Sequence, residues 1–399
     1  MAAKSPRAGA HPSKLTHSSD ATTERGKPVR SRSTVEKTSV DPSWEPPVPG
    51  KRRAVADWEQ YMSLAKSIVG RFHNEFDLRY FDYIHPTRLQ PTLPGRVKKP
   101  YPVKIAFSDW GDLEAPIVIC CGGVANSAMR FNYLAADLMS DFRVICMDWV
   151  GRGRSGWMVD ERDYSLATYT EQLHQLIVHL DRGPVTVLGS SLGGSAAIEL
   201  AARYPKLVKR LILNDIGPYM PKKRRKRRAQ TLARFYVFRE PGDLLRRIGA
   251  SQKNDGPISD DIRFNITFHQ TKWSDDDGGR IYRHDVRALQ AYKRDADQSL
   301  TQWDRWEKIR CPVLLIHGLL SDALQMKTID RMKKSHTMAV MHVPDTGHTP
   351  VLSDRNQCWF IRDWLCGGNA GADWTVLHAA LRDTNGVSIP VMSHNPAGR

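Results

Sequence analysis

Long apolar runs are missing from this sequence of 399 residues. No segment approaches the ~20 consecutive apolar residues that a membrane-spanning helix needs, and the N-terminus lacks the apolar core of a secretory signal peptide. Cysteine is also scarce, because the chain has only 6, and none of their spacings is typical of a zinc site. We therefore expect reduced, mostly buried thiols and a cytoplasmic protein with no integral membrane segment, no metal and no cofactor.

Acidic residues are outnumbered, and the basic excess is concentrated in two places. The chain carries 59 Lys and Arg against 43 Asp and Glu, a net charge of +16. Residues 1–55 hold 11 basic residues against 5 acidic ones, and Lys222–Arg228 adds a run of seven basic residues. Residues 1–55 are also rich in Ser, Thr and Pro, which predicts a disordered basic tail. An organelle transit peptide is the alternative, although the apolar spacing of an amphipathic helix is missing.

The run Lys222–Arg228 has several interpretations. A solvated helix face is the default for such a run. Contact with an anionic membrane surface, binding of nucleic acid, and electrostatic attraction of anionic substrates are the alternatives. Since no DNA- or RNA-binding signature accompanies the run, we expect no nucleic-acid partner. Weak contact with an anionic surface and the oligomeric state stay open.

Short apolar segments alternate with helical patterns over the middle of the chain. Such alternation is typical of a parallel sheet with helices on both faces. The sequence therefore predicts an α/β fold with a mostly parallel, doubly wound sheet. The predicted strands are Val103–Trp110, Pro116–Cys121, Arg143–Asp148, Val185–Leu188, Arg210–Asp215, Pro312–His317 and Met338–Val343.

Residues 219–305 interrupt this alternation. They are polar, helical in propensity and rich in arginine and aromatic residues, so we interpret them as a helical cap inserted between two strands. The predicted division of the chain is a basic tail (1–55), an N-terminal helical and Pro-rich extension (56–100), a first part of the α/β core (101–218), the cap (219–305), a second part of the core (306–367) and a weakly ordered C-terminal tail (368–399).

One predicted strand ends in a motif that carries chemistry. Val185–Leu188 is followed by the sequence GSSLG (Gly189–Gly193) and then by a helical segment with small residues. Strand, sharp turn and helix around G-x-S-x-G form the context of a nucleophile elbow. Glycines two before and two after the serine remove Cβ atoms that would clash in such a turn. We therefore predict Ser191 as a catalytic nucleophile at the positive end of the following helix.

A serine nucleophile needs a base, and the base needs a group that orients it. In doubly wound sheets such groups collect at the carboxyl ends of strands. Asp322 and His348 each lie five residues past a predicted strand, in the order Ser, acid, His that accompanies this elbow. We predict His348 as the base and Asp322 as the acid. Asp215 is the rival acid, but we expect Asn214-Asp215 to fix its strand end by side-chain-to-backbone hydrogen bonds.

The oxyanion that forms during attack needs backbone N–H donors. We predict Leu192, which follows the nucleophile, and Gly123 in preference to Val124, in the loop after Pro116–Cys121. Three residues that follow predicted strand ends are candidate substrate-binding residues: Asn126, Met129 and Trp149.

These motifs together resemble the α/β-hydrolase fold superfamily, in particular its serine esterases and lactonases. The likeness covers residues 101–366. Similar proteins have a helical cap between the sixth and seventh strands of their fold, and residues 219–305 fit that place. The chain departs from many relatives at Cys121-Gly122, where they have His-Gly, so any role of that histidine side chain is lost. Four segments carry the resemblance: Gly189–Gly193, Asp148–Ser155, Gly318–Asp322 and Gly347-His348.

We therefore expect a serine hydrolase that cleaves an ester, thioester or lactone of a small-molecule substrate through an acyl-enzyme on Ser191. A carbon–carbon bond hydrolase with the same triad is the alternative reaction. A weakly active hydrolase fold that serves as a binding module for an anionic surface is the alternative from another class. The substrate itself is not predicted, because the cap shapes the pocket and a fold does not define a function.

Overall fold

A computed structural model of the chain describes residues 54–89, 100–232, 234–251, 256–368, 372–378 and 392–394. The predicted basic tail (1–55) lies almost entirely outside these residues, and so does most of the predicted C-terminal tail (368–399).

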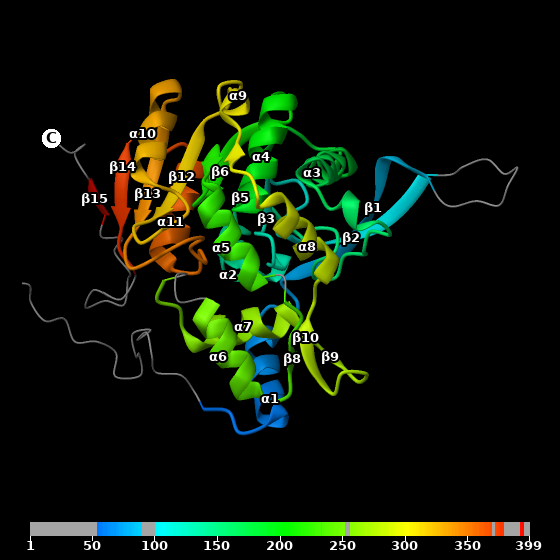
Figure 1. The fold of residues 1–399 in the computed structure, drawn as a ribbon. Helices are drawn as coiled ribbons and strands as arrows, with labels where there is room; N and C mark the ends of the chain where they lie inside the picture. Colours follow the sequence, from blue (N-terminus) through cyan, green and yellow to red (C-terminus); the bar gives the residue numbers. More distant parts are fainter. Residues whose placement is uncertain are drawn as a thin grey trace, which may run out of the picture. The chain divides into compact units, whose positions relative to one another are not determined.

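Within the described ranges, ten strands form one central sheet in the order β1-β2-β4-β3-β5-β6-β12-β13-β14-β15 (Figure 1). The strands from β4 to β14 run parallel, whereas β1 and β2 at one edge and β15 at the other run antiparallel to their neighbours. This architecture confirms the predicted α/β fold with a mostly parallel sheet. The strands are β1 (Phe76–Leu89), β2 (Pro100–Trp110), β3 (Ile117–Cys121), β4 (Arg143–Met147), β5 (Val185–Ser190), β6 (Val208–Asn214), β12 (Val313–Gly318), β13 (Met338–Val343), β14 (Asp373–Val376) and β15 (Met392–His394).

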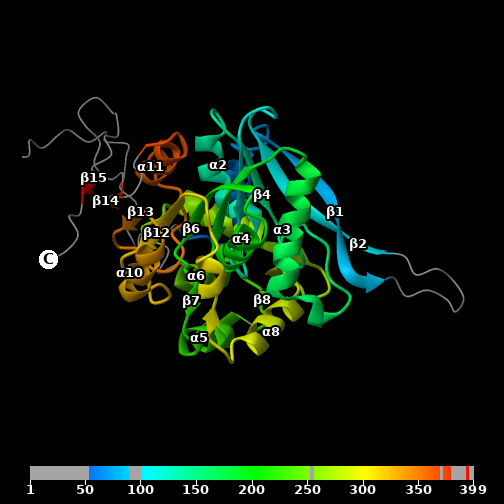
Figure 2. The same ribbon diagram turned by 90° about the horizontal axis from the view of Figure 1, so that it is seen from above.

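Helices cover both faces of this sheet (Figure 2). Successive strand residues point to opposite faces, so Cys121 packs in the core cluster on one face and Cys120 in the cluster on the other. None of the helices in the described ranges is long and apolar enough to cross a membrane. The first face is covered by α3 (Leu166–Leu180), α4 (Leu192–Arg203), α9 (Trp303–Trp306) and α10 (Met326–Ser335), and the second by α2 (Asn132–Leu138) and α11 (Arg355–Leu365).

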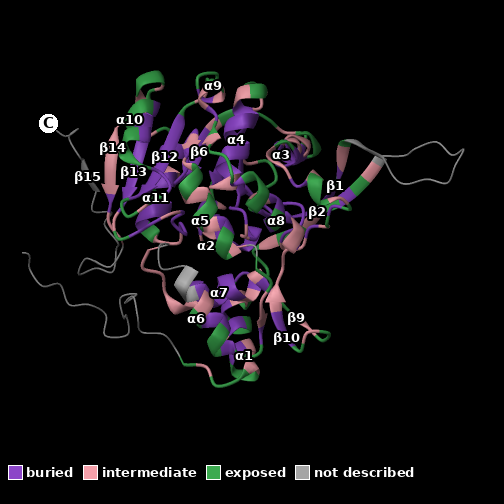
Figure 3. Ribbon diagram, in the orientation of Figure 1, coloured by how far each residue is buried: buried purple, intermediate pink, exposed green. Residues whose placement is uncertain are grey.

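The segment predicted as a cap follows β6 and precedes β12. It holds helices, as predicted, together with two small sheets, β8-β10-β9 and β11-β7. Buried side chains of residues 238–264 form an apolar cluster together with residues 61–68 of the N-terminal extension, and Figure 3 shows buried positions in these parts of the ribbon. The cap elements are β7 (Tyr219–Met220), α5 (Lys222–Leu232), β8 (Val237–Phe238), α6 (Pro241–Ser251), α7 (Asp260–Gln270), β9 (Thr271–Ser274), β10 (Gly279–Tyr282), α8 (Val286–Asp295) and β11 (Leu300–Thr301).

The N-terminal extension contributes to both parts of the molecule. Its first element, α1 (Trp58–Gly70), packs on the cap, where the hydroxyl groups of Tyr61 and Thr267 lie 2.8 Å apart in a buried hydrogen bond. Its second element, β1, is a strand, which differs from the predicted helical and Pro-rich extension. β1 pairs with β2 along most of its length and adds Phe81 and Tyr83 to the core of the sheet.

Candidate active site

Ser191 lies on a strained turn between β5 and α4. Its backbone has φ 49° and ψ −110°, a left-handed conformation that non-glycine residues rarely adopt. The turn is so tight that a Cβ at Gly189 would lie 2.5 Å from backbone atoms of Gly193, and one at Gly193 would lie 2.3 Å from the carbonyl oxygen of Cys121. Gly189 is therefore required by the turn itself, and Gly193 by the close approach of β3.

Ser191, His348 and Asp215 form one hydrogen-bonded chain. The Ser191 Oγ lies 3.1 Å from Nε2 of His348, and Nδ1 of the same imidazole lies 2.8 Å from Oδ2 of Asp215. The Asp215 side chain is fully buried, and that of His348 is 11% exposed. This is the geometry of a nucleophile, a base and an orienting acid.

The prediction that Asp322 orients His348 is wrong. The carboxylate of Asp322 is 43% exposed and forms ion pairs with Arg224 and Arg227 on α5. The rival acid, Asp215, occupies the position next to the imidazole instead. Asp322 therefore stands outside the hydrogen-bonded chain that begins at Ser191.

The pairing of strands explains why Asp215 lies beside the nucleophile. Ser190 on β5 is in register with Asn214 on β6, so the next residue of each strand, Ser191 and Asp215, leaves the sheet at the same level. Asp215 has φ 53°, which turns its side chain under the imidazole. Adjacent strands thus bring the nucleophile and the acid together without a long loop.

Two further donors hold the Asp215 carboxylate. The backbone N–H of Gly318 donates to Oδ1 at 3.1 Å, and the Ser321 hydroxyl donates to Oδ2 at 2.5 Å. The expected bond from this strand end to the backbone is therefore present, but it coexists with the bond to His348. The Asp215 carboxylate thus accepts three hydrogen bonds, from Gly318, Ser321 and His348.

The environment of His348 favours its neutral form. Burial lowers the pKa of His348, the hydrogen bond and charge of Asp215 raise it, and the positive charges of Arg224 and Arg228 lower it further, with a net downward shift. An imidazole that is neutral at pH 7 can accept the proton of Ser191.

The loop after β3 lies beside the nucleophile. A Cβ added at Gly123 would be 3.5 Å from Cβ of Ser191, and the Gly123 N–H donates to Oδ1 of Asn126 at 3.1 Å. Leu192 is the first residue of α4, directly after Ser191. Leu192 is thus next to the nucleophile in the sequence, and Gly123 is close to it in space. Their role as oxyanion donors stays a prediction.

The three predicted substrate-binding residues have different positions. Asn126 lines the cavity above Ser191. Trp149 is fully buried, and its Nε1–H donates to the carbonyl oxygen of Gly122 at 2.8 Å, so it supports the loop after β3. Met129 is also buried, and its carbonyl oxygen accepts a hydrogen bond from Asn265 of α7. Trp149 and Met129 therefore pack inside the protein and line neither of the cavities at Ser191.

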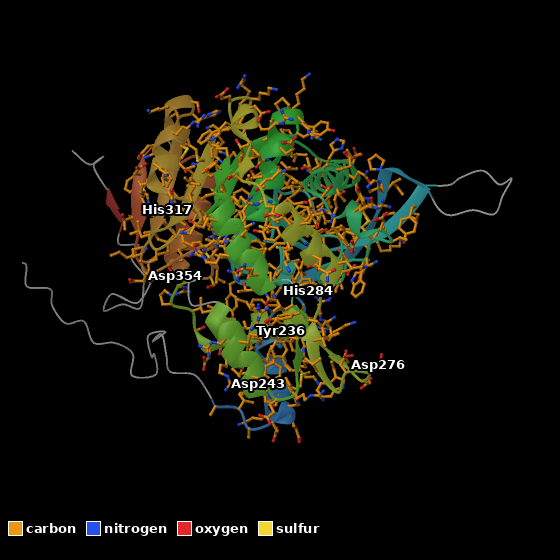
Figure 4. The ribbon with its side chains drawn as sticks, viewed as in Figure 1. Tyr236, Asp243, Asp276, His284, His317 and Asp354 are labelled. Atoms are coloured by element: carbon orange, nitrogen blue, oxygen red, sulfur yellow. The ribbon has the colours of Figure 1, made fainter. Side chains whose placement is uncertain are left out.

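Two cavities meet at Ser191. The first, which we call the cap cavity, has a volume of about 580 Å³ and is lined by Gly123, Ser191 and His348 of the core and by residues of the cap. Tyr236 and His284 lie on the part of the cap that faces the sheet (Figure 4) and belong to its wall. The second, the side cavity, has a volume of about 70 Å³ and contacts Ser191 and Leu192. Among the described residues, no group of His, Cys, Asp or Glu side chains is arranged to hold a metal ion.

The chain belongs to the alpha/beta hydrolase fold family, whose model matches residues 115–354. A 3-hydroxybutyrate-oligomer hydrolase of Cupriavidus necator is 29% identical to it over 265 residues, which are 64% of this chain and 90% of that protein. This chain is thus a hydrolase-fold protein with ester-hydrolysing relatives.

Solved structures show the same fold. An alpha/beta hydrolase of Novosphingobium aromaticivorans has a TM-score of 0.60 at 22% identity, covering 72% of this chain and 96% of that one. An esterase of Mycobacterium tuberculosis has a TM-score of 0.52 at 22% identity, covering 79% of this chain and 100% of that one. At such identities the likeness concerns the fold alone.

Proposed function

We propose that the protein is a serine hydrolase that cleaves an ester of a small-molecule substrate through an acyl-enzyme on Ser191. The observation that carries the proposal is the hydrogen-bonded chain from Ser191 Oγ through His348 to Asp215, at 3.1 and 2.8 Å. A serine hydroxyl is a weak nucleophile by itself, and a hydrogen-bonded imidazole that accepts its proton activates it.

The reaction proceeds in two halves. His348 Nε2 accepts the hydroxyl proton as Ser191 Oγ attacks the carbonyl carbon, and Asp215 stabilises the resulting imidazolium. Backbone N–H groups of Gly123 and Leu192 bind the oxyanion, for which the Gly123 N–H exchanges its bond to Asn126. His348 then gives its proton to the leaving alcohol oxygen. Water, deprotonated by His348, releases the acid from Ser191 in the second half.

The name of the Cupriavidus relative supports an ester of a hydroxy acid as the substrate type. A 3-hydroxybutyrate oligomer is joined by ester bonds, and that relative is aligned with this chain over 90% of its own length. Thioesters and lactones undergo the same acyl transfer and remain within the proposal. Hydrolysis of a carbon–carbon bond by the same three residues remains the competing reaction type.

A fluorophosphonate probe tests the proposal directly. The folded wild-type protein should be labelled at Ser191, and Ser191→Ala should abolish both labelling and turnover of p-nitrophenyl acetate. A wild-type protein that is folded by circular dichroism but takes no label and releases no p-nitrophenol would refute the enzyme proposal and favour the binding-module alternative. Product analysis with a carbon–carbon hydrolase substrate distinguishes the two reaction types.

A further inference from the structure

The cap cavity is positively charged. Among the described residues that line it, five are arginines and Asp243 is the one carboxylate. Burial lowers the pKa of His284, also in its wall, to about 4, so this histidine adds no charge at neutral pH. A concave site of one sign attracts ligands of the opposite sign. The cavity above the nucleophile therefore favours an anionic ligand.

Three of the five arginines have partners that fix them in the wall. Arg130 is buried and donates to a backbone carbonyl oxygen at 2.9 Å. Arg246 forms an ion pair with Asp243, and the guanidinium of Arg247 lies 3.4 Å from the ring centroid of Tyr236. The other two arginines, Arg224 and Arg228, come from α5 and line the same cavity as the catalytic base His348.

Arg224 and Arg228 lie one turn apart on the face of α5 that lines the cavity, whereas Lys223 lies on the exposed face. The Arg224 side chain is only 10% exposed, and its Nε donates to Asp322 at 3.1 Å. Burial lowers the pKa of Arg224, and the nearby Tyr292 and Asp215 oppose this shift. Both residues line the same cavity as His348, and their positive charges lower the pKa of its imidazole.

The two cavities differ in their position relative to the catalytic groups. His348 lines the cap cavity but not the side cavity, whereas Leu192 lines the side cavity but not the cap cavity. Because His348 has to protonate the leaving alcohol, the alcohol component belongs on the side of the cap cavity. The acyl group then extends into the side cavity, whose wall includes Leu166, Met220 and Leu300 and whose volume of about 70 Å³ admits only a few heavy atoms.

We propose that the substrate is an ester bound in one orientation, with a short acyl group in the side cavity and with a carboxylate on its alcohol component paired to Arg224 and Arg228 in the cap cavity. This inference rests on the proposed function, because it takes Ser191 as the nucleophile. Hydrolysis consumes one water molecule and yields the short acid and a hydroxy carboxylate. A guanidinium group suits this task, since it matches a carboxylate with two parallel hydrogen bonds.

Matched esters test the orientation. The first probe, 3-acetoxybutanoate, carries its carboxylate on the alcohol component, and its amide, 3-acetoxybutanamide, has the same shape without the charge. The third probe, monomethyl succinate, carries the carboxylate on the acyl component. We expect kcat/KM for 3-acetoxybutanoate to exceed that of each of the other two by about 10- to 100-fold, the range of a charge-assisted hydrogen bond. Lengthening the acetyl group to octanoyl should lower kcat/KM at least about tenfold, since a group of that size overfills a small cavity.

Variants locate the effect on α5. Arg228→Gln and, separately, Arg224→Gln should each lower the ratio of kcat/KM for 3-acetoxybutanoate over its amide at least about threefold, because each removes one of the two charged donors. Lys223→Gln removes the same charge from the exposed face of the helix and should leave this ratio unchanged. The two arginine variants are tested separately so that one that fails to fold still leaves the other.

The outcomes separate the two proposals. If Ser191→Ala hydrolyses these esters at the same rate as the wild type, the proposed function is refuted. Wild-type hydrolysis of the charged and neutral probes at equal rates, abolished by Ser191→Ala, would leave the function standing and overturn the substrate inference. Loss of the charge preference in Lys223→Gln to the same extent as in Arg228→Gln would overturn the assignment to the cavity, since general attraction by a basic helix would then explain it. A faster reaction with monomethyl succinate would overturn the orientation.

Discussion

Replacing Asp215 by asparagine tests the most specific feature of the proposed triad. The Gly318 N–H donates to Oδ1 at 3.1 Å, so the oxygen of the new side-chain amide would stay at that position. The amide NH2 would then replace Oδ2, which now accepts from His348 Nδ1 at 2.8 Å and from Ser321 Oγ at 2.5 Å. An amide donor facing Nδ1 requires the tautomer of His348 that carries its proton on Nε2. That tautomer cannot accept the proton of Ser191.

The magnitude follows from the tautomer. An aspartate-to-asparagine change that keeps the geometry of a serine triad but reverses the tautomer lowers kcat by about 10⁴. At roughly 1.4 kcal/mol for each factor of ten, this loss corresponds to about 5 kcal/mol of transition-state stabilisation. We therefore expect Asp215→Asn to hydrolyse p-nitrophenyl acetate about 10⁴-fold more slowly and to react correspondingly slowly with a fluorophosphonate, while its circular dichroism spectrum matches that of the wild type.

Asp322→Asn is the matched control. It makes the same chemical change at an exposed carboxylate that pairs with α5, so its kcat for this neutral ester should stay within about threefold of the wild type. The opposite pattern, with a loss of about 10³ or more in Asp322→Asn and near-normal activity in Asp215→Asn, would refute the assignment of the acid.

Three other predictions concern the base, the turn and the cap. Because burial lowers the pKa of His348, kcat/KM for a neutral ester should rise with pH through a midpoint below 6.5 in a pH–rate profile. Arg228→Gln removes a charge that lowers this pKa, so it should move the midpoint upward. Gly193→Ala places a Cβ 2.3 Å from a backbone carbonyl oxygen of β3, so urea denaturation should show a loss of about 1–3 kcal/mol and labelling by a fluorophosphonate should fall. Gly242→Ala, with nothing within 4 Å, is the control and should change the free energy of unfolding by less than about 1 kcal/mol. Tyr61→Ala removes the fully buried ring that docks α1 on the cap and should cost about 3–5 kcal/mol, with faster proteolysis of the cap as the second measurement.

The fold was predictable from the sequence because the central strands are buried on both faces. Val313–Gly318 and Met338–Val343, for example, are buried at every position, so they appear in the sequence as nearly continuous apolar segments, each with one histidine. β1 lacks this signal. It lies at the edge of the sheet and alternates buried Phe81 and Tyr83 with charged residues and with the exposed Tyr80. Its partner β2 supplies the missing pairing, and this pairing is invisible in the local sequence.

The nucleophile and the base could be placed from the sequence, whereas the acid could not. Ser191 and His348 each follow a segment with a clear strand pattern, and each is the residue in its loop that suits the role of nucleophile or base. Two aspartates followed strands, and the choice between them depends on which strand is adjacent to β5 and in which register. The signal that favours Asp215 is its position directly after β6, as Ser191 is directly after β5. Asp322 lies farther along its loop.

The position of the acid also bears on the basic run of α5. In the loop after β12, Ser321 donates to Asp215, which is bonded to His348, and the next residue, Asp322, pairs with Arg224 and Arg227. Lys222 and Lys226 pair with Asp297 in the same way. Arg225 donates to a backbone carbonyl oxygen of the segment before β11.

Four side chains of the run Lys222–Arg228 thus pair with two aspartates, which offset part of its charge, although Lys222, Lys226 and Arg227 remain about half exposed or more. A surface that attracts a membrane or a polynucleotide gains most from exposed charges without such counter-charges. In the orientation that α5 has, Arg224 and Arg228 line the cavity. This arrangement favours a role for the run in recognising the substrate of Ser191 over a role as an independent binding surface.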